Sequence, residues 1–269
     1  MNLPDFSFVQ WGDVIEQYFA LIAICSMRLG VLLIVFPPTS EEVLQGTVRT
    51  AATVMWGAFV AYGQQADLPQ LHGGFLVLVL AKEALIGLVL GYGASIVFWA
   101  AEGAGTYIDD LTGYNNVQLS NPSSGTQTTI TSTLLSQFAI ASFWMLGGMG
   151  LLLGAVYESY RWWPLVSVAP VPAAIVESFV VSRTDTLMQM VAKLAAPVML
   201  ALLLIDVGFA LAAKTSQKLD VTTLGRPVKA LVTLLMLALF AGVFVDQVRD
   251  QLSLENFAAQ VKALGTGAR

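Results

Sequence analysis

Six ionisable side chains lie within or beside long apolar stretches of the sequence. They are Arg28, Lys82, Glu83, Asp109, Asp110 and Asp206. A charge at the centre of a membrane costs roughly 2.5–3.5 kcal/mol on the insertion scale, so such groups are normally paired or face a protein interior. Two uses compete: a path for ions or protons, and ion pairs that fix the packing of helices or subunits. The structural use is more common and is the one favoured here.

Helix geometry limits which of these charges can pair. Lys82 and Glu83 are adjacent, so they point about 100° apart on a helix and are not expected to pair well with each other. Glu83 is instead expected to meet Arg28 from another apolar run. The adjacent acids Asp109 and Asp110 could bind a cation or transfer protons, although such a pair more often marks the end of a span.

The sequence contains few residues that could act as nucleophiles or bind a metal. The sequence has one cysteine, Cys25, and one histidine, His72. Zinc sites made of clustered Cys and His, and the H-E-x-x-H motif, are therefore excluded. A serine–histidine pair would need His72, which lies in a short loop beside Pro69 and Gly73. The sequence predicts no enzyme activity, no metal and no cofactor.

The elements that position the charges are expected to be membrane helices. Hydrophobic residues make up 56% of the 269 residues, charged residues only 12%, and the formal net charge is −5. Soluble proteins carry roughly 25% charged residues, so soluble and disordered classes are excluded. An acidic chain without a long basic cluster is also unsuited to nucleic acid.

Six apolar runs approach the length needed to cross a bilayer, about 20 residues. They cover roughly residues 14–36, 46–63, 75–101, 134–157, 191–213 and 228–245. Apolar residues follow one another without strand alternation, which predicts helices and not barrel strands. The predicted fold class is an all-α membrane protein of about six apolar helices.

Three of the remaining segments allow a structural prediction. Residues 158–186 contain Trp162, Trp163 and several prolines, which predicts an extended crossing followed by a short helix, or a plain structural loop. Residues 214–229 connect the last two runs and are expected to be cytoplasmic because they are rich in cations: Lys214, Lys218, Arg226 and Lys229. Residues 246–269 are expected to form a short amphipathic tail.

The most unusual connection is polar but neutral. No charged residue stands between Asp110 and Glu158, and residues 111–133 are rich in hydroxyl and amide side chains. Asn121-Pro122 and Gly125 mark a turn. A neutral polar segment suits a protein cavity at membrane depth; the alternative is a Ser/Thr-rich linker. We therefore expect amino-terminal helical hairpins in 1–110, a distinct loop in 111–133, and carboxy-terminal helical hairpins with the tail in 134–269.

Glycines predict where helices approach closely. Gly87-x-x-x-Gly91 and Gly150-x-x-x-Gly154 each lie within an apolar run. This spacing lets two helix backbones pack against each other, but it indicates no specific function.

Four stretches together resemble a known family. Residues 80–90, 98–119, 121–125 and 196–229 are similar to the T component of the type III secretion export apparatus, the SctT family, whose flagellar counterpart is FliR. The resemblance extends over nearly the whole chain. The residues that carry it best are Gly105, Ile108, Asp109, Gly113 and Pro122. The neutral loop looks more like the virulence-type or symbiosis-type branch than the flagellar one.

The resemblance implies a core subunit of the export gate in the bacterial inner membrane, a multi-pass protein in contact with lipid. It implies bent helical hairpins packed into a helical assembly with the R and S components, contact with the U component, and passage of unfolded secreted proteins. The neutral loop would plug the channel entry through Thr112, Gly113, Tyr114, Asn115, Asn116, Gln118, Asn121, Pro122, Ser123, Ser124, Gly125, Thr126 and Gln127. The six charges named first would be buried or would contact other subunits.

Two other classes stay open at this point. A small-solute or ion transporter would place polar residues on broken helices in repeated positions, and the sequence shows no convincing inverted repeat. A membrane-embedded enzyme would need a nucleophile and a base, which are lacking. Copurification would separate the classes, because a gate subunit should extract as a large hetero-oligomer.

Overall fold

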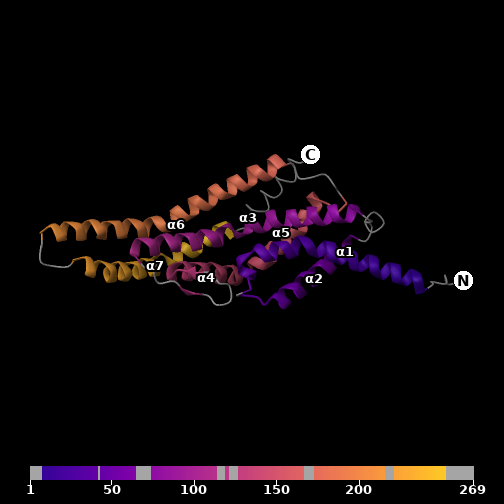
Figure 1. Ribbon diagram of the computed structural model, residues 1–269, viewed down its shortest axis with the longest axis horizontal. Helices are drawn as coiled ribbons and strands as arrows, with labels where there is room; N and C mark the ends of the chain where they lie inside the picture. Colours follow the sequence, from indigo (N-terminus) through magenta and orange to yellow (C-terminus); the bar gives the residue numbers. More distant parts are fainter. Residues whose placement is uncertain are drawn as a thin grey trace. The chain divides into compact units, whose positions relative to one another are not determined.

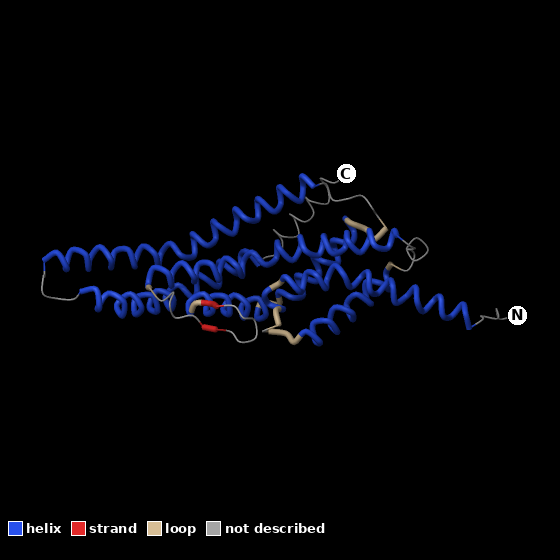
Figure 2. The backbone as a smooth tube through the Cα atoms, in the orientation of Figure 1, coloured by secondary structure: helices blue, strands red, loops and turns tan. Residues whose placement is uncertain are grey.

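The computed structural model describes residues 8–41, 43–64, 74–113, 119–120, 127–166, 173–215 and 221–252. Its helices are α1 (Phe8–Val35), the short 3-10 helix η1 (Pro37–Thr39), α2 (Gly46–Gly63), α3 (Gly74–Thr112), α4 (Ile130–Met145), α5 (Gly148–Trp162), α6 (Ala173–Thr215) and α7 (Val221–Leu252). Two strands, β1 (Leu119–Ser120) and β2 (Gln127–Thr128), form an antiparallel pair. Helices thus dominate the described chain (Figure 2), and the all-helical class is confirmed.

Each predicted apolar run lies in a helix, but the run 134–157 does not form one helix. It is divided into α4 and α5, which meet at a bend of 74°. Leu146 and Gly147 form the turn between them, and Gly147 adopts a φ of +71°. That conformation is strained for residues with a Cβ atom, so Gly147-Gly148 ends α4 where the apolar pattern continues.

The prediction for residues 158–186 was wrong in its second half. No short helix follows the proline-containing stretch; α6 begins at Ala173 and runs unbroken to Thr215, 43 residues in all. The predicted run 191–213 is only its apolar part. Pro197 lies inside α6 without ending it, since packing can offset the backbone hydrogen bond that a proline removes.

Fewer helices than predicted are suited to crossing a membrane. Among the described residues, three helical stretches are long and apolar enough to cross a membrane: Ile15–Val35, Gly74–Thr112 and Val176–Lys214. The bent pair of α4 and α5 is a fourth candidate. The expectation of six spans is therefore not met among the described residues, where α2 and α7 are not among the candidates.

The chain folds into two compact units that alternate along the sequence. Unit 1 comprises Met1–Ser95, Gly150–Val180 and Leu254–Arg269, and unit 2 comprises Ile96–Met149 and Val181–Ser253. Unit 1 thus holds α1, α2, most of α5 and the first half of α3. Unit 2 holds the second half of α3, the strand pair, α4, most of α6, and α7 (Figure 1).

Glycines bring the helices of unit 1 into backbone contact. A Cβ atom on Gly57 of α2 would lie 2.9 Å from the Cα of Ser26, and one on Gly87 of α3 would lie 2.3 Å from the carbonyl oxygen of Arg28. A Cβ atom on Gly91 of α3 would lie 3.2 Å from the Cα of Leu32. Side chains on α2 and α3 would hold both helices away from α1 at these points, so the prediction for Gly87 and Gly91 is confirmed.

Unit 2 is built around the exit of α3. Ile108 of α3 is fully buried with Val198 and Leu202 of α6. A Cβ atom on Gly105 would lie 2.4 Å from the Cα of Ser132, so α3 and α4 also meet at their backbones.

The second glycine motif makes no such contact. A Cβ atom on Gly150 or Gly154 would meet nothing within 4 Å among the atoms of the described chain. The close helix packing predicted for this motif is therefore not found among the described residues.

Candidate functional site

A fully buried ion pair lies at the centre of unit 1. Arg28 of α1 and Glu83 of α3 are both 0% exposed, and Nε of Arg28 is 2.7 Å from Oε2 of Glu83. A second guanidinium nitrogen donates to Oε1 at 3.0 Å, which makes the pair bidentate. Bidentate pairing is the strongest arrangement that arginine offers a carboxylate. The predicted pairing of Glu83 with Arg28 is confirmed.

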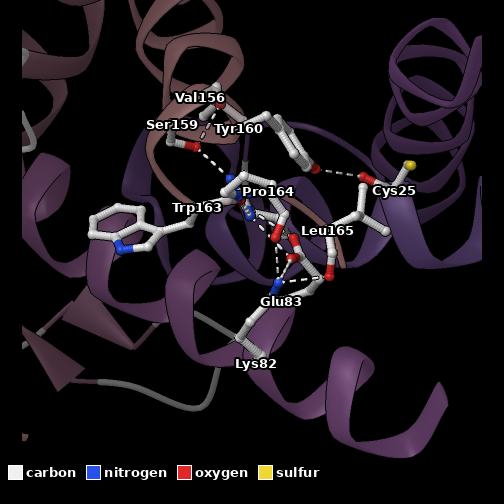
Figure 3. A network of polar contacts seen from close by, with 10 residues as sticks. Cys25, Lys82, Glu83, Val156, Ser159, Tyr160, Trp163, Pro164 and Leu165 are labelled. Carbon is white, nitrogen blue, oxygen red and sulfur yellow. Dashed lines mark hydrogen bonds and ion pairs between the residues drawn. The ribbon is translucent and has the colours of Figure 1, made fainter. Parts of the chain in front are cut away.

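The same guanidinium also holds the end of α5. Arg28 donates to Oγ of Ser159 at 2.7 Å and to the carbonyl oxygen of Trp163 at 3.0 Å. Its carbon lies 3.8 Å from the centre of the Tyr160 ring, within the range of a cation–π contact. The Tyr160 hydroxyl in turn donates to the carbonyl oxygen of Cys25 (Figure 3).

Lys82 belongs to this network, contrary to prediction. Its Nζ lies 3.2 Å from Oε1 of Glu83 and donates to the carbonyl oxygens of Pro164 and Leu165 at 2.7 and 2.8 Å. Figure 3 shows the ammonium reaching these oxygens beside Glu83. The prediction from the 100° separation of adjacent residues was wrong, because the four-carbon stem of lysine carries its charge far from the helix axis.

Sequence reasoning missed Ser159, Tyr160 and the carbonyl groups of 163–165 as partners. The available signal was weak: Ser159 and Tyr160 are polar residues near the end of an apolar run, beside a proline that interrupts the backbone hydrogen bonding. Two cations from α1 and α3 thus fasten three successive carbonyls after α5. This arrangement is that of a structural lock, since each of its charges already has protein partners.

A second buried acid closes the base of the neutral loop in unit 2. Asp109 is 2% exposed at the end of α3. Its Oδ2 accepts from the backbone N–H of Thr131 at 2.7 Å and its Oδ1 from the Thr131 hydroxyl at 2.5 Å. Thr131 lies in the first turn of α4, whose free N–H groups and dipole favour a carboxylate. Asp109 therefore joins the two ends of the loop.

Replacing this acid should loosen the start of α4. We expect Asp109→Ala to cost about 1–3 kcal/mol, because it leaves buried donors of Thr131 unpaired. The side chain of the adjacent Asp110 is exposed and has no hydrogen-bond partner among the described residues, so Asp110→Ala is the matched control. Hydrogen exchange of the amides of residues 130–134 should become faster in the first variant only. Equal protection in both variants would rule out the Asp109 clamp, the pair of hydrogen bonds by which Asp109 holds Thr131.

The structure describes only part of the predicted plug. Thr112 is 3% exposed, and its hydroxyl donates to the carbonyl oxygen of Asp109 at 2.9 Å. Gly113 turns the chain out of α3 with a φ of +81°. Gln127 pairs with Ser120 in the strand ladder. The other predicted plug residues lie outside the described part: Tyr114, Asn115, Asn116, Gln118, Asn121, Pro122, Ser123, Ser124, Gly125 and Thr126.

Asp206 pairs with a cation that sequence reasoning did not assign to it. Its side chain is 54% exposed, and Oδ1 lies 2.5 Å from Nζ of Lys229 on α7. Both residues line a pocket of about 390 Å³, together with Asp110, Leu111, Thr112, Gly113, Phe209, Ala210, Ala213, Gly225 and Arg226. A signal existed: an acid in one apolar run needs a cation, and Lys229 begins the next run.

Comparison with known proteins identifies the family. Residues 19–254 match the model of the bacterial export proteins, family 1. Yop proteins translocation protein T of Yersinia pestis is 30% identical over 231 residues, which cover 85% of this chain and 88% of that protein. Flagellar biosynthetic protein FliR of Bacillus subtilis is 27% identical over 179 residues, covering 66% and 69%. Surface presentation of antigens protein SpaR of Shigella flexneri is 22% identical over 252 residues, covering 92% and 95%.

These matches decide between the classes that the sequence left open. The matched region includes the ion-pair lock of unit 1 and the Asp109 clamp of unit 2, so it extends over both compact units. A family of export components favours neither a solute transporter nor an enzyme. With three or four candidate spans, the chain is a multi-pass protein of the bacterial inner membrane and belongs to family 1 of the bacterial export proteins, the T and FliR components of type III secretion and flagellar export.

Proposed function

We propose that this chain plugs the entry of a type III export channel with residues 112–133, and that unfolded polypeptides displace this plug as they pass. The carrying observation is the Asp109 clamp. Because Asp109 holds Thr131, the two ends of the segment are tied together at the helices. A loop whose two ends are tied in this way can be displaced without unpacking α3 from α4.

The composition of the segment supports the same role. The segment lies within the uncharged stretch between Asp110 and Glu158. A fixed charge at a constriction would attract or repel the charged side chains of a sliding polypeptide, whereas hydroxyls and amides offer weak contacts that exchange easily. The strand pair gives the segment a defined base, with Leu119 opposite Thr128 and Ser120 opposite Gln127.

Partners follow from the family as proposals. Membership of the export family implies assembly with other apparatus subunits. We propose the R and S components as neighbours in a helical gate built of bent hairpins, and the U component as a further contact. The larger coverage by the Yersinia relative than by the flagellar one supports a secretion system of the virulence or symbiosis type.

Shortening the hairpin tests the plug directly. Residues 121–126 would be replaced by Asn-Gly, which forms the tight turn that an antiparallel strand pair accepts and so keeps Ser120 opposite Gln127. We expect the tagged complex to assemble with unchanged mass apart from the deletion, while the membrane becomes leaky to small ions. The readouts are native mass in detergent and conductance in planar bilayers.

A length-matched control distinguishes the effect of a shorter segment from the effect of a changed sequence. In this control, Gly and Ser replace residues 121–126 at the same positions, which preserves the length of the segment. It should stay closer to the sealed wild type than the shortened variant does. If the shortened variant assembles and does not conduct, the plug is wrong; if it fails to assemble, the segment serves assembly instead.

A further inference from the structure

A single ammonium group fastens the exit of α3 to two other helices. Nζ of Lys229 on α7 pairs with Asp206 on α6. The same nitrogen donates to the carbonyl oxygen of Leu111 on α3 at 3.1 Å. Leu111 stands two residues before Gly113, where the chain turns out of the helix. Lys229 therefore holds the point at which the proposed plug begins.

The Leu111 carbonyl needs such a partner because it lies in the last turn of α3. The N–H of Gly113 bonds to the carbonyls of Asp109 and Asp110 at 3.1 and 3.3 Å. The Thr112 hydroxyl also returns to the carbonyl of Asp109. The carbonyl of Leu111 accepts from Lys229, and a cation at a helix carboxy-terminus is stabilising.

This contact differs in kind from the ion-pair lock of unit 1. Arg28 and Glu83 are both fully buried, so breaking their pair would leave a charge without water. Asp206 is 54% exposed and Lys229 is 15% exposed, and the pocket of about 390 Å³ lies beside them. Water can therefore solvate both groups when they separate. Exposed pairs are weak for this reason, so the contact is suited to repeated opening.

The start of α7 is also suited to movement. Pro227 lies inside α7, between Arg226 and Lys229. Without an N–H, Pro227 cannot bond to the carbonyl four residues earlier, so the first turns of α7 are weakly held to the rest of the helix. Nε of Arg226 lies 3.8 Å from where a Cβ atom of Gly113 would be. Movement of this part of α7 would therefore reach Gly113 directly.

We propose that Lys229 is a positioning residue for the plug: together with Asp206, it forms a reversible contact with the Leu111 carbonyl that fixes the exit of α3 where residues 112–133 begin. This inference rests on the proposed function of residues 112–133. It adds a reversible contact to the permanent clamp made by Asp109.

The test compares four variants of the full complex. Lys229→Met removes the ammonium and keeps an apolar stem; Lys229→Arg keeps a cation; Asp206→Asn weakens the hold on Lys229. Lys193→Met is the matched control, since Lys193 is an exposed residue of α6 in unit 2 without an ion pair among the described residues. Planar-bilayer conductance reports opening, and hydrogen exchange of residues 107–113 reports the exit of α3.

We expect Lys229→Met to assemble normally and to raise the open fraction about threefold to tenfold, the change expected when a half-exposed charge-assisted contact is lost. Exchange of residues 107–113 should become faster in the same variant. Asp206→Asn should give a smaller rise, and Lys229→Arg and Lys193→Met should resemble wild type. In the shortened-hairpin background, Lys229→Met should add no further leak, because the shortened segment no longer seals the channel.

The outcomes separate this inference from the proposed function. If the shortened hairpin leaks and Lys229→Met stays sealed with unchanged exchange, the positioning role of Lys229 is wrong and the plug stands. If the shortened hairpin itself stays sealed, the plug is wrong and the positioning role of Lys229 fails with it. Should Lys229→Met not assemble, Asp206→Asn decides: a leak supports the positioning role of Lys229, and a sealed complex overturns it.

Discussion

Glu83→Ala should be among the most damaging single substitutions in this chain, at about 3–5 kcal/mol, because it leaves a fully buried guanidinium without its carboxylate. Arg28 would keep only Ser159, the Trp163 carbonyl and the Tyr160 ring. None of these neutralises its charge. Lys82 would lose the same counter-charge, since it lies 3.2 Å from Glu83. We expect little assembled complex in detergent extracts.

Two further variants test the reason for that loss. Glu83→Gln keeps the size of the side chain and part of its hydrogen bonding, so it should be less harmful than Glu83→Ala. Arg28→Lys keeps the charge but cannot reproduce the forked contacts to Glu83, Ser159 and Trp163. Glu177→Ala is the matched control, because Glu177 is an exposed carboxylate of the same unit. If Glu83→Ala yields as much complex as Glu177→Ala, the argument from burial is wrong.

Gly105→Ala is expected to have the second large effect. The added methyl group would lie 2.4 Å from the Cα and 2.5 Å from the backbone nitrogen of Ser132. Backbone atoms cannot rotate away as a side chain can, so α3 and α4 must separate. Overpacking of this kind costs about 1–3 kcal/mol. Because Asp109 and Thr131 lie beside this contact, their hydrogen bonds should weaken as well.

The control for this prediction comes from the glycines that face open space. Gly154→Ala and Gly208→Ala each add a methyl group that meets nothing within 4 Å in the described chain. In a helix such changes are neutral or stabilising. Thermal unfolding in detergent should show a lower midpoint for Gly105→Ala than for either control. Equal midpoints would contradict the close approach of α3 and α4.

Composition and apolar runs were enough to predict the helices themselves. A segment that buries its surface in lipid or protein must be apolar over many residues, and this property is written in the sequence. The pairing of Arg28 with Glu83 was also predictable, because a carboxylate in an apolar run requires a cation and Arg28 lies in another such run. The family followed from the motif around Gly105, Asp109 and Gly113 together with the late helices.

Helix lengths and breaks were less accessible. The apolar pattern continues through Leu146 and Gly147, yet the backbone turns there because Gly147 adopts a positive φ. The opposite error occurred in α6, which extends to Ala173 through polar residues that the apolar pattern excluded. Such boundaries depend on local backbone conformation and on packing along the whole helix. Average hydrophobicity reports neither.

The polar partners were decided by the tertiary structure. Lys82 joins Glu83 of its own helix because the chain after α5 brings two carbonyls within reach of the same flexible side chain. Lys229 meets both Asp206 and the Leu111 carbonyl because α3, α6 and α7 converge at one point. The sequence determined that these charges need partners, since burial without pairing is costly. Which partner each one has depends on hydrogen-bond distances between helices far apart in the chain, and these exist only once the helices have packed.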